Sequence, residues 1–159
     1  MVNALRILVL SDSHGCVSNL FDAFDREPTA RYAFFLGDGV LRAQEVMALY
    51  SQKILCKAVA GNCDFGSDYP DFDTVTVEGV KIYFTHGHKN YVKFGLSRLI
   101  LEAKSQGANI ALFGHTHEQY YEYADGLHLL NPGSICEGKY AVADITPAGI
   151  VCVGKRLSF

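Results

Sequence analysis

The chain has 159 residues, of which 49% are hydrophobic and 19% are charged, and its formal net charge is -3. This length supports one domain with a sizeable core, so we expect a single domain over residues 1–159, and the composition excludes a disordered chain. The weak negative charge, without a cluster of Lys or Arg, predicts no nucleic-acid groove. The apolar run near the N-terminus is too short for a signal peptide or a membrane span, so we expect no membrane contact.

The first half of the chain alternates apolar runs with helical patterns. Residues 5–10, 32–36 and 54–59 predict buried strands, because each is a short apolar run bounded by turn residues. Residues 18–25 and 41–49 predict the helices between them. A β-α-β-α-β order with short connections implies parallel strands whose carboxyl ends lie side by side.

Polar side chains follow each of these three strands. Asp12 and His14 come after the first, Asp38 lies between two glycines after the second, and Asn62 and Asp64 come after the third. A helix cap or a turn would also explain an isolated aspartate at such a position. Ligand crevices in α/β sheets lie outside the carboxyl ends of strands, which favours a functional interpretation.

The second half of the chain is richer in strands. An amphipathic helix is predicted over 96–106 and a short buried strand over 110–112. Three hairpins, each with a glycine in its turn, are predicted over 72–78 with 80–85, 119–123 with 127–130, and 140–145 with 150–153. Residues 131–134 predict a turn. This number of strands fits two β-sheets between helical layers better than one open sheet.

Histidines gather beside glycines in this second half. His86 and His88 follow a predicted strand, and His115 and His117 follow another. Side chains alternate along an extended backbone, so we expect His115 and His117, two positions apart, to project to the same face. For an isolated His-x-His motif, two loop histidines without a ligand are an open alternative.

Together, the strand ends supply oxygen and imidazole ligands without thiolate, from Asp12, His14, Asp38, Asn62, His86, His115 and His117. Such a set suits two divalent metal ions, with Mn²⁺ as our first expectation and Fe²⁺, Zn²⁺, Co²⁺ or Ni²⁺ as alternatives. A pair of ions roughly 3.5–4 Å apart binds phosphoryl oxygens and lowers the pKa of a bridging water, which attacks in line. The sequence therefore predicts phosphoester hydrolysis.

The motifs occur in a characteristic order, namely Asp12-Ser-His14, Gly37-Asp38, Gly61-Asn62-Cys63-Asp64, Thr-His86-Gly-His88, Gly114-His115-Thr116-His117 and Asn-Pro-Gly-Ser at 131–134. In this order they resemble the calcineurin-like metallophosphoesterase superfamily, and most closely its small bacterial and archaeal phosphodiesterases. The resemblance implies an α/β fold, a four-layer αββα sandwich of two mixed β-sheets flanked by helices. It also implies hydrolysis of a small-molecule phosphodiester by a water or hydroxide that bridges two metal ions.

By this resemblance, two metal sites would share Asp38 as the bridge. The first would consist of Asp12, His14, Asp38 and His117. The second would consist of Asp38, Asn62, His86 and His115.

Cys63 departs from the family pattern. Many members have a histidine at this position, thought to contact the scissile phosphate and help the leaving group depart. A thiol is a weak hydrogen-bond donor, so we expect a preference for leaving groups of low basicity and poor reaction with alkyl phosphomonoesters. A small buried cysteine without a catalytic role is the alternative.

Two further residues are candidates for the catalytic set, which also contains Asp38, Asn62 and Cys63. His88 would contact substrate or orient a ligand, or it would be an ordinary loop histidine. Asp64 would orient a neighbouring ligand or cap its loop.

Other functions stay open at this point. The same site would serve a phosphomonoesterase or a protein phosphatase. A retromer subunit has the fold that the resemblance implies and works as a scaffold with a degraded metal site, whereas each ligand position is filled here. Edge strands and apolar surface in so small a domain also favour a homodimer or a higher homo-oligomer.

The five cysteines are odd in number and scattered along the chain. Their spacing predicts neither a disulfide framework nor cysteine ligation of zinc. Free thiols are typical of a reducing compartment, so we expect a cytoplasmic location.

Overall fold

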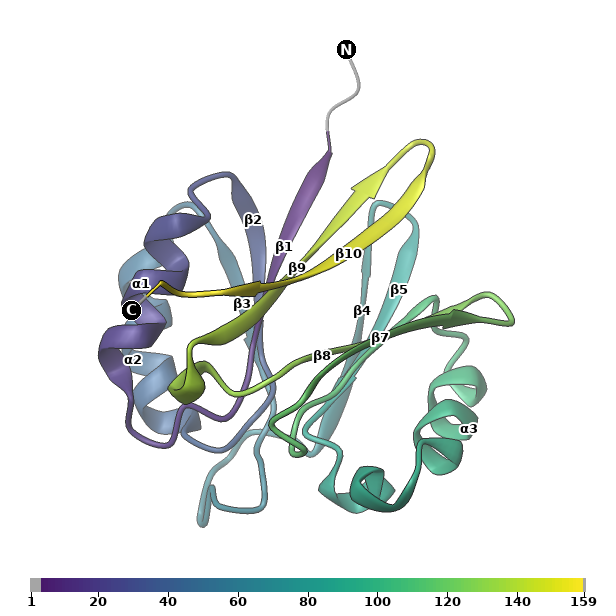
Figure 1. Ribbon diagram of the computed structural model, residues 1–159, viewed down its shortest axis with the longest axis horizontal. Coiled ribbons are helices and arrows are strands. Elements are labelled where there is room, and N and C mark those ends of the chain that lie inside the picture. Colours follow the sequence, from purple (N-terminus) through teal and green to yellow (C-terminus); the bar gives the residue numbers. More distant parts are fainter. Residues whose placement is uncertain (1–3, 159) are drawn as a thin grey trace.

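The first half of the chain folds as alternating strands and helices in the computed structural model, which describes residues 4–158 (Figure 1). Its elements are β1 (Leu5–Leu10), α1 (Val17–Arg26), β2 (Ala30–Phe35), α2 (Val40–Tyr50) and β3 (Leu55–Ala58). β2 pairs in parallel with both β1 and β3. The predicted β-α-β-α-β unit is therefore confirmed, and its three strands end at the same edge.

The second half contains the three predicted hairpins and one longer helix. The hairpins join β4 (Phe72–Val77) to β5 (Val80–Thr85), β7 (Gln119–Ala124) to β8 (Leu127–Pro132), and β9 (Lys139–Thr146) to β10 (Gly149–Arg156). Between them lie α3 (Ser97–Ser105), the short strand β6 (Ile110–Leu112), and the 3₁₀ helices η1 (His88–Asn90), η2 (Val92–Phe94) and η3 (Ile135–Glu137). The predicted turn starts later than expected, because β8 includes Pro132.

The strands form two mixed sheets of five. The first sheet has the order β10-β9-β1-β2-β3, and the second has the order β4-β5-β6-β8-β7. β1 lies at the centre of the first sheet, where it pairs with β2 in parallel and with β9 in antiparallel orientation. In the second sheet, β6 pairs in parallel with β5 and β8.

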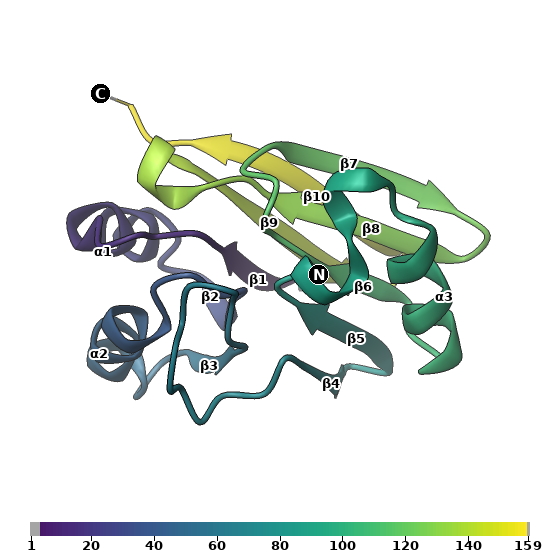
Figure 2. The ribbon, with the colours of Figure 1, turned by 90° about the horizontal axis from the view of Figure 1, so that it is seen from below.

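Apolar side chains pack between four layers, with α1 and α2 on one side and α3 on the other (Figure 2). Alternation along β1 shows why: Leu8 and Leu10 face α1 and α2, whereas Ile7 and Val9 face the second sheet. A third cluster packs Leu99 of α3 against the outer face of the second sheet. The αββα sandwich implied by the resemblance is therefore confirmed. No helix within residues 4–158 has the length and apolar character to cross a membrane.

Two of the cysteines form a disulfide that the sequence did not predict. Cys16 precedes α1, Cys136 lies in η3, and the structure joins them by a disulfide with their Cα atoms 5.2 Å apart. The expectation of no disulfide is therefore wrong for this pair. Spacing along the sequence cannot reveal it, because 120 residues separate the two cysteines and only the return of η3 to the start of α1 brings them together.

Candidate metal centre

The candidate site lies where loops from both sheets meet at the ends of strands. Loops after β1, β2 and β3 supply its oxygen ligands and one imidazole, and loops after β5 and β6 supply the other imidazoles. The structure brings together all seven predicted ligands, which are Asp12, His14, Asp38, Asn62, His86, His115 and His117.

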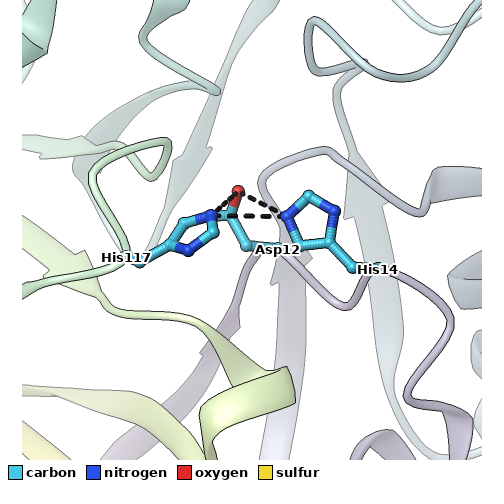
Figure 3. A group of neighbouring side chains, drawn as sticks. All are labelled: Asp12, His14 and His117. Carbon is cyan, nitrogen blue, oxygen red and sulfur yellow. Dashed lines mark hydrogen bonds and ion pairs between the residues drawn. The ribbon is translucent and has the colours of Figure 1, made fainter.

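The first group of ligands consists of Asp12, His14 and His117, whose ligand atoms all lie within 4.8 Å of one another (Figure 3). Asp12 Oδ1 lies 3.3 Å from His117 Nε2 and 3.7 Å from His14 Nε2. The two imidazole Nε2 atoms lie 3.3 Å apart. Both rings thus present a nitrogen to the same carboxylate oxygen.

The second group consists of Asp38, His86 and His115, which also lie within 4.8 Å of one another through their ligand atoms. His86 Nε2 lies 3.4 Å from Asp38 Oδ2, 3.2 Å from His115 Nδ1 and 3.1 Å from Asn62 Oδ1. The other ring nitrogen of His86 donates a hydrogen bond to the carbonyl oxygen of Leu36 at 2.7 Å. This bond fixes the orientation of the ring and leaves Nε2 facing the group.

The two groups are neighbours, and Asp38 lies between them. Its Oδ2 is 3.9 Å from His14 Nε2, and Asp12 Oδ1 is 3.9 Å from His86 Nε2. His14, Asp38 and Cys63 form a third set of ligand atoms within 4.8 Å. Both carboxylates therefore lie within 3.9 Å of histidines from both groups.

These donors fit divalent metal ions. Asp12 is fully buried, yet its Oδ1 has no hydrogen-bond partner within residues 4–158. A buried carboxylate oxygen without a partner is unfavourable, and two imidazole nitrogens face it at the distances given above. A cation shared by the three atoms would satisfy all of them, and oxygen with imidazole nitrogen is a donor set for borderline-hard divalent ions.

Opposite charges shift the pKa values of Asp38 and His86. Burial would raise the pKa of Asp38, but the hydrogen bond and charge of His86, the Cys63 N–H and the charge of His14 hold it well below its usual range. Burial would lower the pKa of His86, but the carboxylates of Asp38 and Asp12 outweigh it and raise that pKa. Asp38 is therefore ionised at neutral pH, and His86 holds a proton more tightly than a free imidazole does, so a metal ion would have to displace it.

The pKa values of His115 and His88 shift in the opposite direction to that of His86. Burial and then the charge of His86 lower the pKa of His115 to about 4, and Lys93 adds to the effect. The same two causes lower the pKa of His88. His115 is therefore a neutral imidazole at pH 7, with a free lone pair for a ligand. The ring of His88 packs near those of His86 and His115, and its buried Nδ1 has no hydrogen-bond partner among the residues described.

The expected reason for the convergence of the histidines is wrong, because these loops are not extended. β6 ends at Leu112, and His115 and His117 have φ values of 71° and 63°, in the left-handed region. The two side chains join different ligand groups, as the resemblance implied. Asp12, His14 and Asp38 also have positive φ, which is costly for residues other than glycine and is concentrated at functional sites.

Glycines permit the close approach of these loops. A Cβ atom at Gly61 would overlap the carboxylate and the backbone nitrogen of Asp38. A Cβ atom at Gly114 would overlap the hydroxyl of Ser11 and lie 3.0 Å from Asp12 Oδ2. Glycine at these two positions therefore lets the aspartates occupy the centre of the site.

Asp64 holds the Asp38 loop through backbone hydrogen bonds. Its carboxylate accepts bonds from the N–H groups of Asp38 at 2.7 Å, Gly39 at 2.8 Å, Val40 at 3.1 Å and Gly61 at 2.8 Å. Val40 is the first residue of α2, so Asp64 also caps that helix. These contacts match the interpretation of Asp64 as a residue that caps its loop and orients a ligand.

Cys63 is exposed, so the interpretation of this residue as a small buried cysteine is wrong. Its backbone N–H donates to Asp38 Oδ1 at 2.8 Å. Desolvation and then the charge of Asp38 raise the pKa of its thiol. The side chain is therefore a protonated thiol that faces the ligand groups.

Several supporting contacts come from residues that sequence reasoning did not assign. The Ser134 hydroxyl donates to the Asp12 carbonyl at 2.8 Å, and Asn131 Nδ2 donates to the Gly114 carbonyl at 3.1 Å. Glu137 Oε2 lies 3.6 Å from His117 Nδ1. Asn131 and Ser134 belong to the Asn-Pro-Gly-Ser motif, which was visible in the sequence but carried no indication of what it contacts.

Two relatives share sequence with the chain. The protein named probable metallophosphoesterase YsnB from Bacillus subtilis is 34% identical over 132 residues, which cover 82% of this chain and 75% of the relative. A phosphodiesterase from Methanocaldococcus jannaschii is 35% identical over 66 residues, which cover 42% of this chain and 36% of the relative.

Solved structures share the fold. A protein from Streptococcus pneumoniae described as a predicted phosphoesterase has a TM-score of 0.78 at 26% identity, with 98% of this chain and 100% of the other covered. Vacuolar Protein Sorting 29 from Cryptosporidium parvum has a TM-score of 0.74 at 16% identity, with 98% and 99% covered, which is a likeness of fold alone.

The family assignment rests on most of the chain. Residues 5–148 match the calcineurin-like phosphoesterase superfamily domain, and this span contains every ligand described above. The two-sheet sandwich and the clustered donors agree with that match. The chain therefore belongs to the calcineurin-like phosphoesterase superfamily.

Proposed function

We propose that this protein is a metal-dependent phosphodiesterase that acts on a small-molecule substrate. The observation that carries the proposal is the pair of adjacent ligand groups at the strand ends, with Asp38 between them. The name of the archaeal relative supports cleavage of a diester rather than a monoester.

Asp38 would bridge two ions. The first ion would be held by Asp12, His14, Asp38 and His117, and the second by Asp38, Asn62, His86 and His115. Two divalent ions held by these residues would supply Lewis-acid activation of the phosphoester and of a water nucleophile. Mn²⁺ is our first choice, and Fe²⁺, Zn²⁺, Co²⁺ and Ni²⁺ suit the same oxygen and imidazole donors.

Three further residues would orient the ligands or contact the leaving group of the substrate. Asp64 positions the Asp38 loop through the four backbone hydrogen bonds described above. The protonated thiol of Cys63 would offer the substrate only a weak hydrogen bond, which favours leaving groups of low basicity. Neutral His88, packed beside His86 and His115, would help to orient those two rings.

The test is hydrolysis of bis(p-nitrophenyl) phosphate and p-nitrophenyl phosphate by protein loaded with Mn²⁺, with chelator-treated protein as the control. We expect faster cleavage of the diester and loss of activity in the chelated sample. Preference for the monoester would indicate a phosphatase. The protein could instead bind Mn²⁺, Fe²⁺, Zn²⁺, Co²⁺ or Ni²⁺ and hydrolyse neither ester. That result would favour the scaffold alternative.

A further inference from the structure

The disulfide between Cys16 and Cys136 joins the segment that carries Asp12 and His14 to the segment that carries Glu137, which lies beside His117. Cys16 lies two residues after His14, in the loop that continues from β1 into α1. Cys136 directly precedes Glu137, whose carboxylate lies 3.6 Å from the Nδ1 atom of His117. Cys16 is thus close to His14 along the chain, and Cys136 is next to a residue that contacts His117.

We propose that Cys16 and Cys136 are a redox-active pair that sets how tightly the ligand group of Asp12, His14 and His117 binds its metal ion. The disulfide state binds the ion more tightly, and the dithiol state binds it more weakly. The proposal rests on the proposed function only in requiring that this group binds a divalent ion.

The pair is placed for reversible oxidation. The Cα separation of 5.2 Å lies within the usual range for a disulfide. Both side chains are only partly buried, and small thiols or disulfides can therefore reach them. Burial raises the pKa of the Cys56 and Cys152 thiols to about 11 and about 12, so these two thiols are protonated and unreactive at neutral pH.

Coupling to the metal ligands follows from how the two segments contact each other. The backbone N–H of Ile135 donates to the Ser11 carbonyl at 2.9 Å, and Asn19 Nδ2 donates to the Ile135 carbonyl at 2.9 Å. The bond to Ser11 lies next to buried Asp12, and Asn19 also donates to the Cys136 carbonyl at 3.3 Å. The disulfide adds a covalent tie between the same two segments.

The two histidines are the ligands that such a tie would affect most. The side chains of His14 and His117 are 35% and 39% exposed, whereas that of Asp12 is 0% exposed. Core packing therefore fixes Asp12 but fixes the histidines much less. Constraining the His14 segment, and the Glu137 carboxylate beside His117, reduces the conformational entropy lost when a metal ion is bound.

The redox step requires a low-molecular-weight disulfide as the oxidant. The thiolate of one cysteine attacks a sulfur of that disulfide, forms a mixed disulfide and releases one thiol. The second cysteine thiolate attacks the cysteine sulfur of the mixed disulfide and releases the second thiol. The two cysteine sulfurs lose two electrons, the oxidant gains them, and the two protons leave with the released thiols.

The test compares wild-type protein oxidised with glutathione disulfide and protein reduced with dithiothreitol, each desalted without oxygen. Tryptic mapping reports the cross-link between the peptides 7–26 and 105–139, which contain the two cysteines. Calorimetric titration with Mn²⁺ then measures the affinity of each form. We expect the reduced form to bind Mn²⁺ about tenfold more weakly, as is typical when support around metal ligands is lost.

Serine variants test whether the change in Mn²⁺ affinity comes from Cys16 and Cys136 or from another thiol. Cys16→Ser and Cys136→Ser should each show the weak affinity under both conditions. Cys152→Ser, which removes a thiol in β10, should keep the difference between the two conditions.

Absence of the cross-linked peptide after oxidation would overturn the proposal, and so would equal Mn²⁺ affinity of fully cross-linked and fully reduced wild-type protein. Redox-dependent Mn²⁺ binding in a protein that hydrolyses no phosphoester would sink the proposed function but support this inference. Absence of Mn²⁺ binding in both forms would defeat the metal site on which both proposals depend.

Discussion

Asp38 faces histidines from both ligand groups, and its charge is maintained by its surroundings. Replacement by Asn preserves the shape of the side chain and removes the negative charge. We predict that Asp38→Asn abolishes binding of two Mn²⁺ ions per chain and lowers phosphoesterase activity by about 100-fold or more, since even residues that only support metal ligands cost 10–100-fold. Calorimetric stoichiometry and the two nitrophenyl esters are the measurements.

The matched control is Asp73→Asn in β4, an exposed carboxylate whose hydrogen bond is to the neighbouring N–H of Thr74. It should keep both the stoichiometry and the activity. Full activity of Asp38→Asn would rule out the bridging role.

At Cys63, the prediction concerns which ester is cleaved. An imidazolium is a much stronger donor than a thiol and can protonate a leaving group. We predict that Cys63→His raises the rate on p-nitrophenyl phosphate relative to the diester. Cys63→Ser is the control for loss of the thiol alone, and an unchanged preference in Cys63→His would remove this residue from the explanation.

The shifted pKa values of His86 and Asp38 predict how metal binding depends on pH. The pKa of His86 is raised above 6.5, so metal-free protein retains this proton at pH 6 and the ion must displace it. The pKa of Asp38 is lowered, so its carboxylate does not compete for protons in this range. Mn²⁺ affinity should therefore rise with pH, by up to about tenfold per unit below the His86 pKa for one displaced proton. Equal affinities at pH 6 and pH 8 would contradict this.

The loops after the strands depend on Asp64 for their conformation. Its carboxylate satisfies four backbone N–H groups, three around the start of α2 and one at Gly61. Asp64→Ala should lower the free energy of unfolding by about 2–4 kcal/mol, because several charge-assisted hydrogen bonds are lost and their donors are left unpaired. Urea denaturation of metal-free protein measures this. Asp68→Ala, an exposed neighbour, is the control, and equal stability of the two variants would contradict the role of Asp64.

The strands could be predicted from the sequence because their apolar pattern has a short, regular period. Leu8 and Leu10 alternate with Ile7 and Val9, and this pattern survives in the sheet without change. The convergence of ligands was also predictable, because the β-α-β-α-β order places the carboxyl ends of its parallel strands at the same edge of the sheet.

The conformation of the loops was not predictable in this way. The left-handed backbone at His115 and His117 is imposed by tertiary contacts such as the bond from Asn131 to Gly114, which is set by β8. The Cys16–Cys136 disulfide likewise depends on a contact between distant segments. Local sequence patterns carry no information about such contacts.

Across the whole molecule, the site connects the two sheets. Asp12, His14, Asp38 and Asn62 follow strands of the first sheet, and the other three histidines follow strands of the second. An ion bound to both sets stabilises the native state only, because the unfolded chain does not assemble the ligands.

Mn²⁺ should therefore raise the melting temperature. At 100 times the dissociation constant, the expected gain is about 2.7 kcal/mol per site. Differential scanning fluorimetry with Mn²⁺ and with chelator tests this, and Asp38→Asn should show a smaller shift. Identical melting curves for the wild-type protein under the two conditions would exclude a metal ion that joins the sheets.

The central position of β1 has a consequence for how the protein folds. β1 lies between β2 and β9, and the pairing of Arg6 with Asp144 spans 138 residues of chain. All seven proposed ligands precede residue 118, yet the strand that completes the sheet beside Asp12 comes after them. Contacts so distant in sequence raise the contact order and slow folding. During synthesis, the ligands therefore leave the ribosome well before the strand that fixes them, and the metal site is completed only after β9 has emerged.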